Sequence, residues 1–266
     1  VLYMLTMGRG PLGYIVGTMF LVSCLAMVAG SLLRQRGSAK SAARHERREY
    51  LRYLDRTRAV VRETARAQRE ALEWAAPAPG TLWSIAASRR LWERRSGDAD
   101  FGTVRVGTGP RFLATPLVPG ETAPVEDLDP LCAVRLKRFI DAHSVVPDLP
   151  VQLALRRFAS LAVTASDDPD RARALFRAVV AHAVTFHSPR DLRVVLCAGD
   201  VEAPEWSWLK WLPHTHHPEE TDHAGPVRMM HPALAVLEDW LGAELTRRTR
   251  FNRDAEPDPD LPHLLV

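Results

Sequence analysis

The longest apolar stretch of the chain lies near its beginning. From Leu12 to Leu33 the sequence reads LGYIVGTMFLVSCLAMVAGSLL, without a charged side chain. About twenty such residues span the hydrocarbon core of a bilayer as an α-helix. The pattern predicts a transmembrane helix over residues 12–33, with a buried core helix as the alternative. A signal peptide fits less well, because its apolar part is usually about 7–15 residues long.

Basic residues are unevenly placed around this stretch. One, Arg9, precedes it, and a cluster follows it: Arg34, Arg36, Lys40, Arg44, Arg47 and Arg48. Cationic residues stay on the cytoplasmic side of a membrane. Everything after Leu33 is therefore expected to be cytoplasmic, and the protein to lie in the cell membrane. Residues 1–11 are typical of the end of an upstream membrane segment followed by a turn, although a valine-coded start would account equally well for Val1.

A charged, helix-favouring segment runs from Ser41 to Trp74. Its apolar residues recur every three or four positions and give a thin stripe: Leu51, Leu54, Val61, Ala65 and Leu72. A nucleic-acid-binding arm is one alternative. We favour a solvated stalk whose arginines face anionic lipid. Pro77, Pro79 and Gly80 end this helix. A second helix, Thr81–Arg95, is predicted to return along the first, which makes residues 34–96 a helical stalk.

After Gly97 the periodicity changes, and residues 97–266 are predicted to form an α/β domain. The expected elements are a strand at 101–107, a helix from a cap at Asp127 or Asp129 to His143, and an extended segment at 145–155. A strand at 158–164, a helix at 172–186 and a strand at 192–198 then form a βαβ unit. A second unit comprises a strand at 227–230, a helix at 232–247 and a strand at 264–266. These elements predict a three-layer domain that is truncated, because the chain stops inside an apolar run.

The turn at Thr164–Arg171 occupies the place where nucleotide-binding α/β proteins hold phosphate. A P-loop needs glycines to wrap the phosphate, a lysine and a Ser/Thr for magnesium. This turn has neither glycine nor lysine, and its aspartates would repel a triphosphate. We therefore predict a degenerate nucleotide site with no catalytic residue, formed by Ser166, Asp167, Asp168 and Arg171. Ser166 is expected to cap a helix rather than to act as a nucleophile.

Other candidate side chains have more ordinary interpretations. Trp206, Trp208, Trp211 and Pro213 form either a loop packed on the domain or a partner surface, and we favour packing. The histidines of the following segment, His214, His216, His217 and His223, invite a zinc site, but no cysteine or patterned carboxylate joins them. We expect a polar loop. Cys197 is expected to be an inert core thiol, and the acidic stretch 254–262 carries no predicted chemistry.

Composition adds limits to this picture. The chain has 266 residues, a net charge of +3 and 46% hydrophobic residues. These values exclude a disordered chain, a collagen-like chain and a disulfide scaffold. Three widely spaced cysteines fit a reducing compartment.

Several segments in one order resemble a known family. After the apolar start come ERREYLRYLDRTRAVVR, LWERRSGDADFGTVRVGTG, LDPLCAVRLKRFIDAHSVVPDLP, FHSPRDLRVVLCAG and WSWLKWLPHTHHP. This order resembles the EccC/EssC-type membrane ATPases of type VII secretion systems, which are FtsK/SpoIIIE-like. The most specific segments are WSWLKWLP and FHSPRDL. The resemblance covers nearly the whole chain and implies the N-terminal portion of a longer motor.

The resemblance also implies a function for each part. This segment would supply the anchor, the stalk and a degenerate ATPase-like domain that couples to downstream ATPase domains, which use ATP and Mg. No cofactor of this segment itself is certain. Implied partners are the lipid bilayer, other membrane subunits, exported proteins and further copies of the chain in a hexamer, with no nucleic acid. The alternatives are a DNA translocase of the FtsK/SpoIIIE class and, without positive support, a small-molecule enzyme.

Overall fold

A computed structural model describes residues 11–119, 129–165, 168–253, 258 and 260–266, with the backbone alone at 11–18 and 32–40. The predicted turn at residues 9–11 therefore lies mostly outside the described part. The chain divides into two compact units. Unit 1 comprises residues 1–64 and 115–144, and unit 2 comprises residues 65–114 and 145–266.

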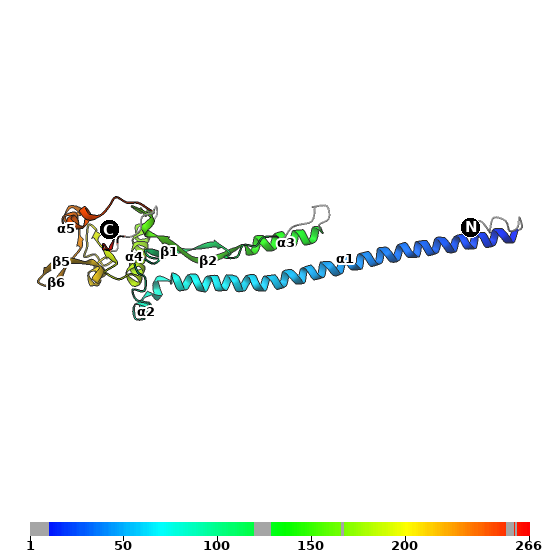
Figure 1. The fold of residues 1–266 in the computed structure, drawn as a ribbon, viewed down its shortest axis with the longest axis horizontal. Coiled ribbons are helices and arrows are strands. Elements are labelled where there is room, and N and C mark those ends of the chain that lie inside the picture. Colours follow the sequence, from blue (N-terminus) through cyan, green and yellow to red (C-terminus); the bar gives the residue numbers. More distant parts are fainter. Residues whose placement is uncertain (1–10, 120–128, 166–167, 254–257, 259) are drawn as a thin grey trace. The chain divides into compact units, whose positions relative to one another are not determined.

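The first element, α1 (Pro11–Ala75), is a single helix of 65 residues that contributes to both units (Figure 1). No proline interrupts it, and alanine, arginine, glutamate and leucine favour the helix. It ends before Pro77, as predicted. Among the described residues, no helix is both long and apolar enough to cross a membrane. The predicted membrane helix over residues 12–33 thus has no support from the structure.

Unit 1 pairs the middle of α1 with α3 (Pro130–His143), which runs alongside it in Figure 1. Leu54 and Val61 of the predicted stripe are buried, and so is Phe139 of α3. The predicted helix to His143 is confirmed. Of the two candidate caps, Asp129 fills the role, because its carboxylate accepts from the backbone N–H groups of residues 131 and 132.

The predicted helix Thr81–Arg95 is wrong in length and in packing. A 3₁₀ turn, η2 (Pro79–Thr81), leads into a five-residue helix, α2 (Leu82–Ala86). Its buried residues Leu82 and Ile85 pack on Phe186 and not along α1. Residues 87–92 form turns, and the positive φ of Trp92 is incompatible with a continuing helix.

The main antiparallel pair of unit 2 is formed by β1 (Thr103–Phe112) and β2 (Val145–Ala154). The predicted extended segments are confirmed. The strand β1 continues past the predicted end at residue 107 and runs through Gly107 and Gly109, with register shifts beside both glycines. Val104 of β1 packs with Leu155, Ala183 and Leu192 in one core cluster. Leu155 begins the short turn η4 (Leu155–Arg157).

Parallel pairing surrounds the segment at residues 192–197. There β3 (Leu192–Val194) pairs with β8 (His263–Leu265), and β4 (Leu196–Cys197) pairs with β7 (Met230–His231). Successive amides alternate in direction: Val195 N–H donates to the carbonyl of residue 265, and Leu196 N–H to that of residue 229. The short segment is therefore flanked on both edges, in the parallel sense that its continuous apolar sequence predicted.

The predicted strand Phe158–Thr164 is wrong. Residues 158–165 form no strand and have no strand partner in the described part of the chain. Phe158 and Leu161 are exposed. The helix that follows, α4 (Pro169–Phe186), is confirmed, but the strand before it is missing, so the predicted first βαβ unit is not formed as proposed.

The last part of unit 2 contains a helix and a hairpin. The predicted helix at 232–247 is observed as α5 (Leu234–Arg247). Leu237 and Leu241 of α5 pack with Val195 and Met229. Residues of the expected polar loop instead form η6 (Pro213–Thr215) and the hairpin of β5 (His216–Asp222) with β6 (Gly225–Arg228). The preceding turn is η5 (Ser207–Trp211).

The observed fold class agrees with the prediction in part. The described residues form helices with four two-stranded sheets, a mixed helix and sheet architecture. The three-layer arrangement stays a prediction.

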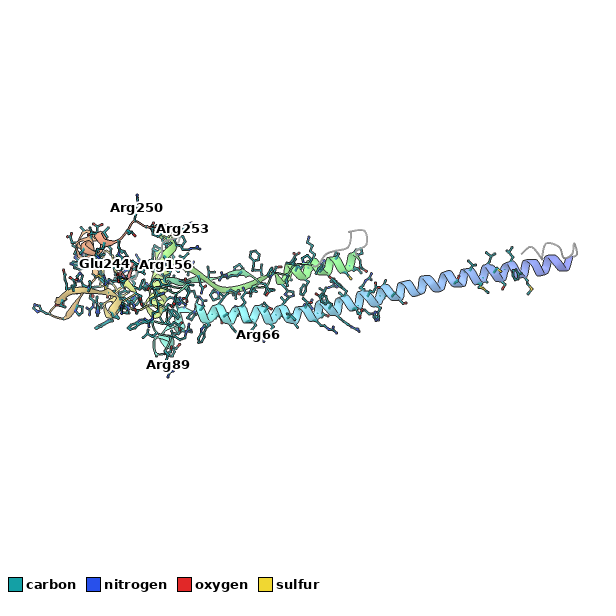
Figure 2. The ribbon with its side chains drawn as sticks, in the orientation of Figure 1. Arg66, Arg89, Arg156, Glu244, Arg250 and Arg253 are labelled. Atoms are coloured by element: carbon teal, nitrogen blue, oxygen red, sulfur yellow. The ribbon has the colours of Figure 1, made fainter. Side chains whose placement is uncertain are left out.

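Glu244 of α5, labelled in Figure 2, is part-buried between the guanidinium groups of Arg193 and Arg248 and links β3 to the end of α5.

Candidate functional site

The predicted nucleotide turn is only partly described. Ser166 and Asp167 lie outside the described residues. Asp168 caps α4, because its carboxylate accepts from the backbone N–H of Asp170 at 3.0 Å. Arg171 is exposed and lies 3.4 Å from Asp168. A carboxylate thus occupies the helix N-terminus, where a phosphate would bind. Nucleotide binding at this turn stays a prediction.

The three tryptophans of the segment 206–213 differ in exposure. In η5, Leu209 is buried and Trp208 is half-buried, and the indole N–H of Trp208 donates to the carbonyl of Glu205 at 2.9 Å. Trp206, directly before η5, is also half-buried. Trp211 is 79% exposed, and Pro213 is exposed at the start of η6. Packing therefore describes two of the three tryptophans, whereas Trp211 projects from the surface.

His187 occupies the centre of unit 2. It is fully buried, and its Nε2 accepts a hydrogen bond from the backbone N–H of Gly102 at 2.9 Å. Since Nε2 is the acceptor, Nδ1 carries the proton and donates to the carbonyl of Ala183 at 2.8 Å. The carbonyl of His187 in turn accepts from Nε2 of His214 at 2.8 Å. Burial lowers the pKa of His187 and holds the ring neutral.

This arrangement joins three segments that are far apart in the sequence. Gly102 comes from LWERRSGDADFGTVRVGTG, His187 from FHSPRDLRVVLCAG and His214 from WSWLKWLPHTHHP. Phe101 adds an edge-on ring contact with His187 at 4.8 Å. We call these four residues the His187 cluster. Its donors and acceptors are directed at each other, which is typical of a structural network and not of a group presented to substrate.

Arg94 is a second buried node that sequence reasoning missed. Its guanidinium donates to the carbonyls of Thr103, at 2.7 Å, and of Ala75. It lies 4.3 Å from the ring of Phe186. Its Nε is 2.8 Å from a carboxylate oxygen of Asp100 but makes no aligned hydrogen bond. Burial lowers the pKa of Arg94, and Asp100 opposes that shift.

Arg94 therefore ties the end of α1 to the start of β1 and the end of α4. A charged residue between turns carries no sequence signal for burial. Its partners are mostly backbone carbonyls, which no motif identifies.

The histidines do not gather as a metal site. His214 is buried in the His187 cluster, and His217 bonds along its own hairpin, with Nδ1 accepting from the backbone N–H of Glu220 at 2.8 Å. Within the described ranges, no group of three or more His, Cys, Asp and Glu side chains could hold a metal ion. Cys197, predicted to be a core thiol, is exposed at the end of β4, because that two-residue strand lies at the surface.

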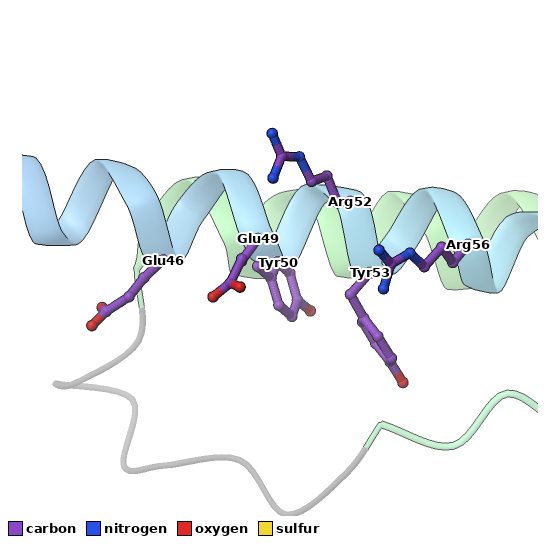
Figure 3. A pocket seen from close by; sticks show the side chains of 6 residues that line it. All are labelled: Glu46, Glu49, Tyr50, Arg52, Tyr53 and Arg56. Carbon is purple, nitrogen blue, oxygen red and sulfur yellow. The ribbon is translucent and has the colours of Figure 1, made fainter.

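Unit 1 contains part of the predicted stalk and has surface features of its own. Arg47 of α1 pairs with Asp129, the cap of α3, through Nε at 3.0 Å. This arginine lowers the pKa of Asp129, chiefly by hydrogen bonding. Figure 3 shows an open hollow on α1 lined by two glutamates, two arginines and two tyrosines: Glu46, Glu49, Tyr50, Arg52, Tyr53 and Arg56. Its mixed charges and openness point to a solvated helix face and not to a catalytic site.

The known proteins that this chain resembles include several EccC proteins of ESX secretion systems. No protein-family model matches the chain. The ESX secretion system protein EccC of Thermomonospora curvata is 48% identical over 258 residues, which are 97% of this chain and 19% of that protein. The ESX-3 protein EccC3 of Mycobacterium tuberculosis is 36% identical over 253 residues, 94% of this chain and 19% of that protein. The ESX-4 protein EccC4 of the same species is 39% identical over 203 residues, 76% of this chain and 16% of that protein. The chain thus spans less than a fifth of the length of these relatives.

Proposed function

Since this chain is homologous over nearly its whole length to EccC proteins of ESX type VII secretion systems, we propose that it is the anchor, stalk and coupling part of a secretion motor. The homology is the observation that carries the proposal. The names of these relatives favour export of proteins over the DNA-translocase alternative. Other subunits of the secretion complex and small exported proteins are the partners that this role implies.

Each part of the chain has a proposed task. Residues 12–33 would hold the protein in the cell membrane, with the basic residues after them on the cytoplasmic side. Within residues 34–96, the part in α1 would form the stalk, and this uninterrupted helix supports a stiff connection. Within residues 97–266, the parts that belong to unit 2 would form the ATPase-like domain that passes force or nucleotide state to the stalk.

We propose that this domain couples and does not hydrolyse ATP. The turn at 164–171 lacks the P-loop glycines and lysine, and Asp168 is engaged as a helix cap. The His187 cluster supports a structural role for the segments that carry the family resemblance, because their polar groups satisfy one another inside the fold.

The anchor is tested by membrane fractionation of the full-length protein and of a variant without residues 12–33. The proposal expects the intact protein in the membrane fraction, resistant to salt extraction, and the shortened variant in the soluble fraction. Recovery of the intact protein as a soluble species would contradict the anchor.

The secretion role is tested in the host cell by replacing the gene and measuring export of small proteins into the medium. Deletion is expected to abolish export, and the wild-type gene to restore it. The variant Lys137→Gln, a change at an exposed side chain of α3, serves as a control that should also restore export. Normal export after deletion would contradict the role.

A further inference from the structure

Unit 1 contains a second hollow, of about 380 Å³, along one edge of the α1–α3 pair. From α1 it is lined at i, i+3, i+4 and i+7, starting at Leu51 and ending at Arg58. From α3 it is lined at i, i+3, i+4, i+7 and i+8, from Arg135 to His143. These spacings place one face of each helix on the hollow. Both faces belong to the same unit.

The hollow has an apolar floor and a basic rim. Its floor includes the buried side chains of Leu54 and Phe139. The rim holds three arginines, Arg58, Arg135 and Arg138. Guanidinium groups gathered on one edge repel each other unless negative charge lies among them.

Among the residues that the structure describes, the lining of this hollow includes one carboxylate, that of Asp55. Asp55 lies 2.7 Å from the guanidinium of Arg58 and is engaged there. Arg58 also lies 5.9 Å from the ring centroid of Phe139, which fixes it against the floor. Arg135 and Arg138 are exposed, and neither has an ion-pair partner in the part of the chain that the structure describes. Two positive charges of the rim are therefore left for a ligand.

His143, the last residue of α3, lines the same hollow. Burial lowers the pKa of His143, and the charges of Arg58 and Arg62 lower it further. The histidine belongs to the lining of the hollow, so an anion bound there would oppose that effect.

We propose that this hollow is a binding site for a phosphate-bearing anion. Guanidinium groups bind phosphate oxygens bidentately, and the apolar floor accepts a non-polar part of the same ligand. The ligand could come from solution or from a lipid headgroup. Arg58 follows Leu33 by 25 residues, or about 37 Å of helix. That length is several times the Debye length of about 8 Å. With residues 12–33 as the proposed anchor, this distance favours a soluble phosphorylated compound.

The test uses the whole 266-residue chain and inorganic pyrophosphate at constant ionic strength. Calorimetry measures affinity, and NMR titration of the His143 ring measures its pKa. Pyrophosphate is expected to bind saturably and to raise the pKa of His143. The double variant Arg135→Gln, Arg138→Gln is expected to weaken binding by about tenfold or more, since it removes two charge-assisted contacts from exposed positions.

The matched control is Arg52→Gln, at an exposed arginine of α1 that lines the other hollow. It should change the affinity less than about twofold. Equal weakening by the control and the double variant would overturn the site, because it would indicate unspecific attraction to a basic helix. Absence of any saturable pyrophosphate binding, together with an unchanged His143 titration, would also overturn it.

Two further probes separate the sources of ligand. Phosphatidylglycerol vesicles that raise the pKa of His143 more strongly than pyrophosphate would support the phosphate site and assign it to a lipid headgroup. A poly-glutamate peptide that binds when pyrophosphate does not would overturn the proposal in favour of an acidic protein partner. The fractionation result does not affect the pyrophosphate test, so failure of the anchor and failure of this site are distinguishable.

Discussion

The backbone N–H of Gly102 donates a hydrogen bond to Nε2 of His187 across 85 residues of sequence, at 2.9 Å and out of contact with solvent. The bond fixes the ring as a neutral acceptor at Nε2 and a donor at Nδ1. It also fixes Gly102, which has a φ of +70° and follows Phe101, another member of the cluster. The bond joins two of the segments that carry the family resemblance inside unit 2.

Replacing His187 should destabilise unit 2 strongly. His187→Ala leaves the amide of Gly102 without its partner and opens a cavity, which together cost about 3 kcal/mol of unfolding free energy. Because all seven tryptophans lie in unit 2, urea unfolding followed by tryptophan fluorescence reports this unit. The control His223→Ala, at an exposed position of the β5–β6 hairpin, should stay within about 0.5 kcal/mol. Equal effects of the two variants would contradict the central position of His187.

Gly102 should not tolerate a side chain. The Cβ of an alanine at this position would lie 3.1 Å from Cγ of Arg156. The alanine backbone would also have to keep the positive φ of Gly102. We expect Gly102→Ala to lower the unfolding free energy by about 1–2 kcal/mol. Gly107→Ala is the matched control, because nothing lies within 4 Å of its Cβ position. The same urea experiment compares them, and a Gly102→Ala protein as stable as the Gly107→Ala protein would refute the explanation.

His182 should behave oppositely to His187, although both are buried in unit 2. Neither ring nitrogen of His182 has a hydrogen-bond partner in the described structure, and burial lowers its pKa to about 3. An unpaired buried polar group costs free energy. His182→Leu should therefore leave the stability unchanged or raise it by about 1 kcal/mol, whereas His187→Leu should lower it. A clear loss of stability in His182→Leu would reveal a polar partner.

The buried histidines predict acid sensitivity. Burial lowers the pKa of His182 to about 3 and that of His263 to about 4, and it lowers the pKa values of His187 and His214 as well. In the unfolded chain each ring takes up a proton near pH 6.5, whereas in the folded chain the lowered pKa keeps the ring neutral to a lower pH. Unfolding then binds protons, so the unfolding free energy is largest above pH 6.5 and falls as the pH decreases.

Each ring contributes a slope of up to about 1.4 kcal/mol per pH unit between pH 6.5 and its own folded pKa. Urea unfolding at pH 7.5, 6 and 5 measures the combined slope. His182→Leu should make it shallower by one proton, while the exposed control His223→Ala should not. Equal stability across this range would contradict neutral buried rings.

The cysteines should differ in reactivity. Cys197 is exposed, whereas Cys132 is half-buried and has a pKa raised by burial and by Asp129. Since the thiolate is the reactive form, Ellman's reagent should modify Cys197 about tenfold faster or more. Chains that keep one cysteine each, with serine at the other two positions, allow the comparison. Faster modification of Cys132 would contradict this prediction, because it would mean that Cys132 is the more accessible thiol.

Local signals predicted the elements that depend on local chemistry. Asp129 followed by Pro130 gives a helix start, and the cap is observed there. The apolar run at 192–198 predicts a strand of a parallel sheet, and β3 and β4 pair in the parallel sense with β8 and β7. In these cases the residue pattern and the packing agree.

The features that the sequence pattern did not predict depend on partners far away in the sequence. Phe158–Thr164 is apolar enough for a strand, but a strand needs a partner, and the segment at 192–197 pairs with β8 and β7 instead. Arg94 carries no motif, because its partners are backbone carbonyls from distant turns. The predicted tryptophan segment could be located from sequence, but the exposure of Trp211 depends on which side of η5 carries the buried Leu209.

The most direct test of the structural role of His187 is NMR of its side-chain nitrogens as the pH is lowered from 7.5 to 5. The His187 cluster predicts a neutral ring at pH 7.5, with the proton on Nδ1 and no proton on Nε2, because the ring is hydrogen-bonded on both sides. Its pKa should lie below that of an accessible histidine, because the ring is buried. A ring protonated on Nε2, or one that titrates near pH 6.5 as an accessible catalytic histidine would, would contradict the account.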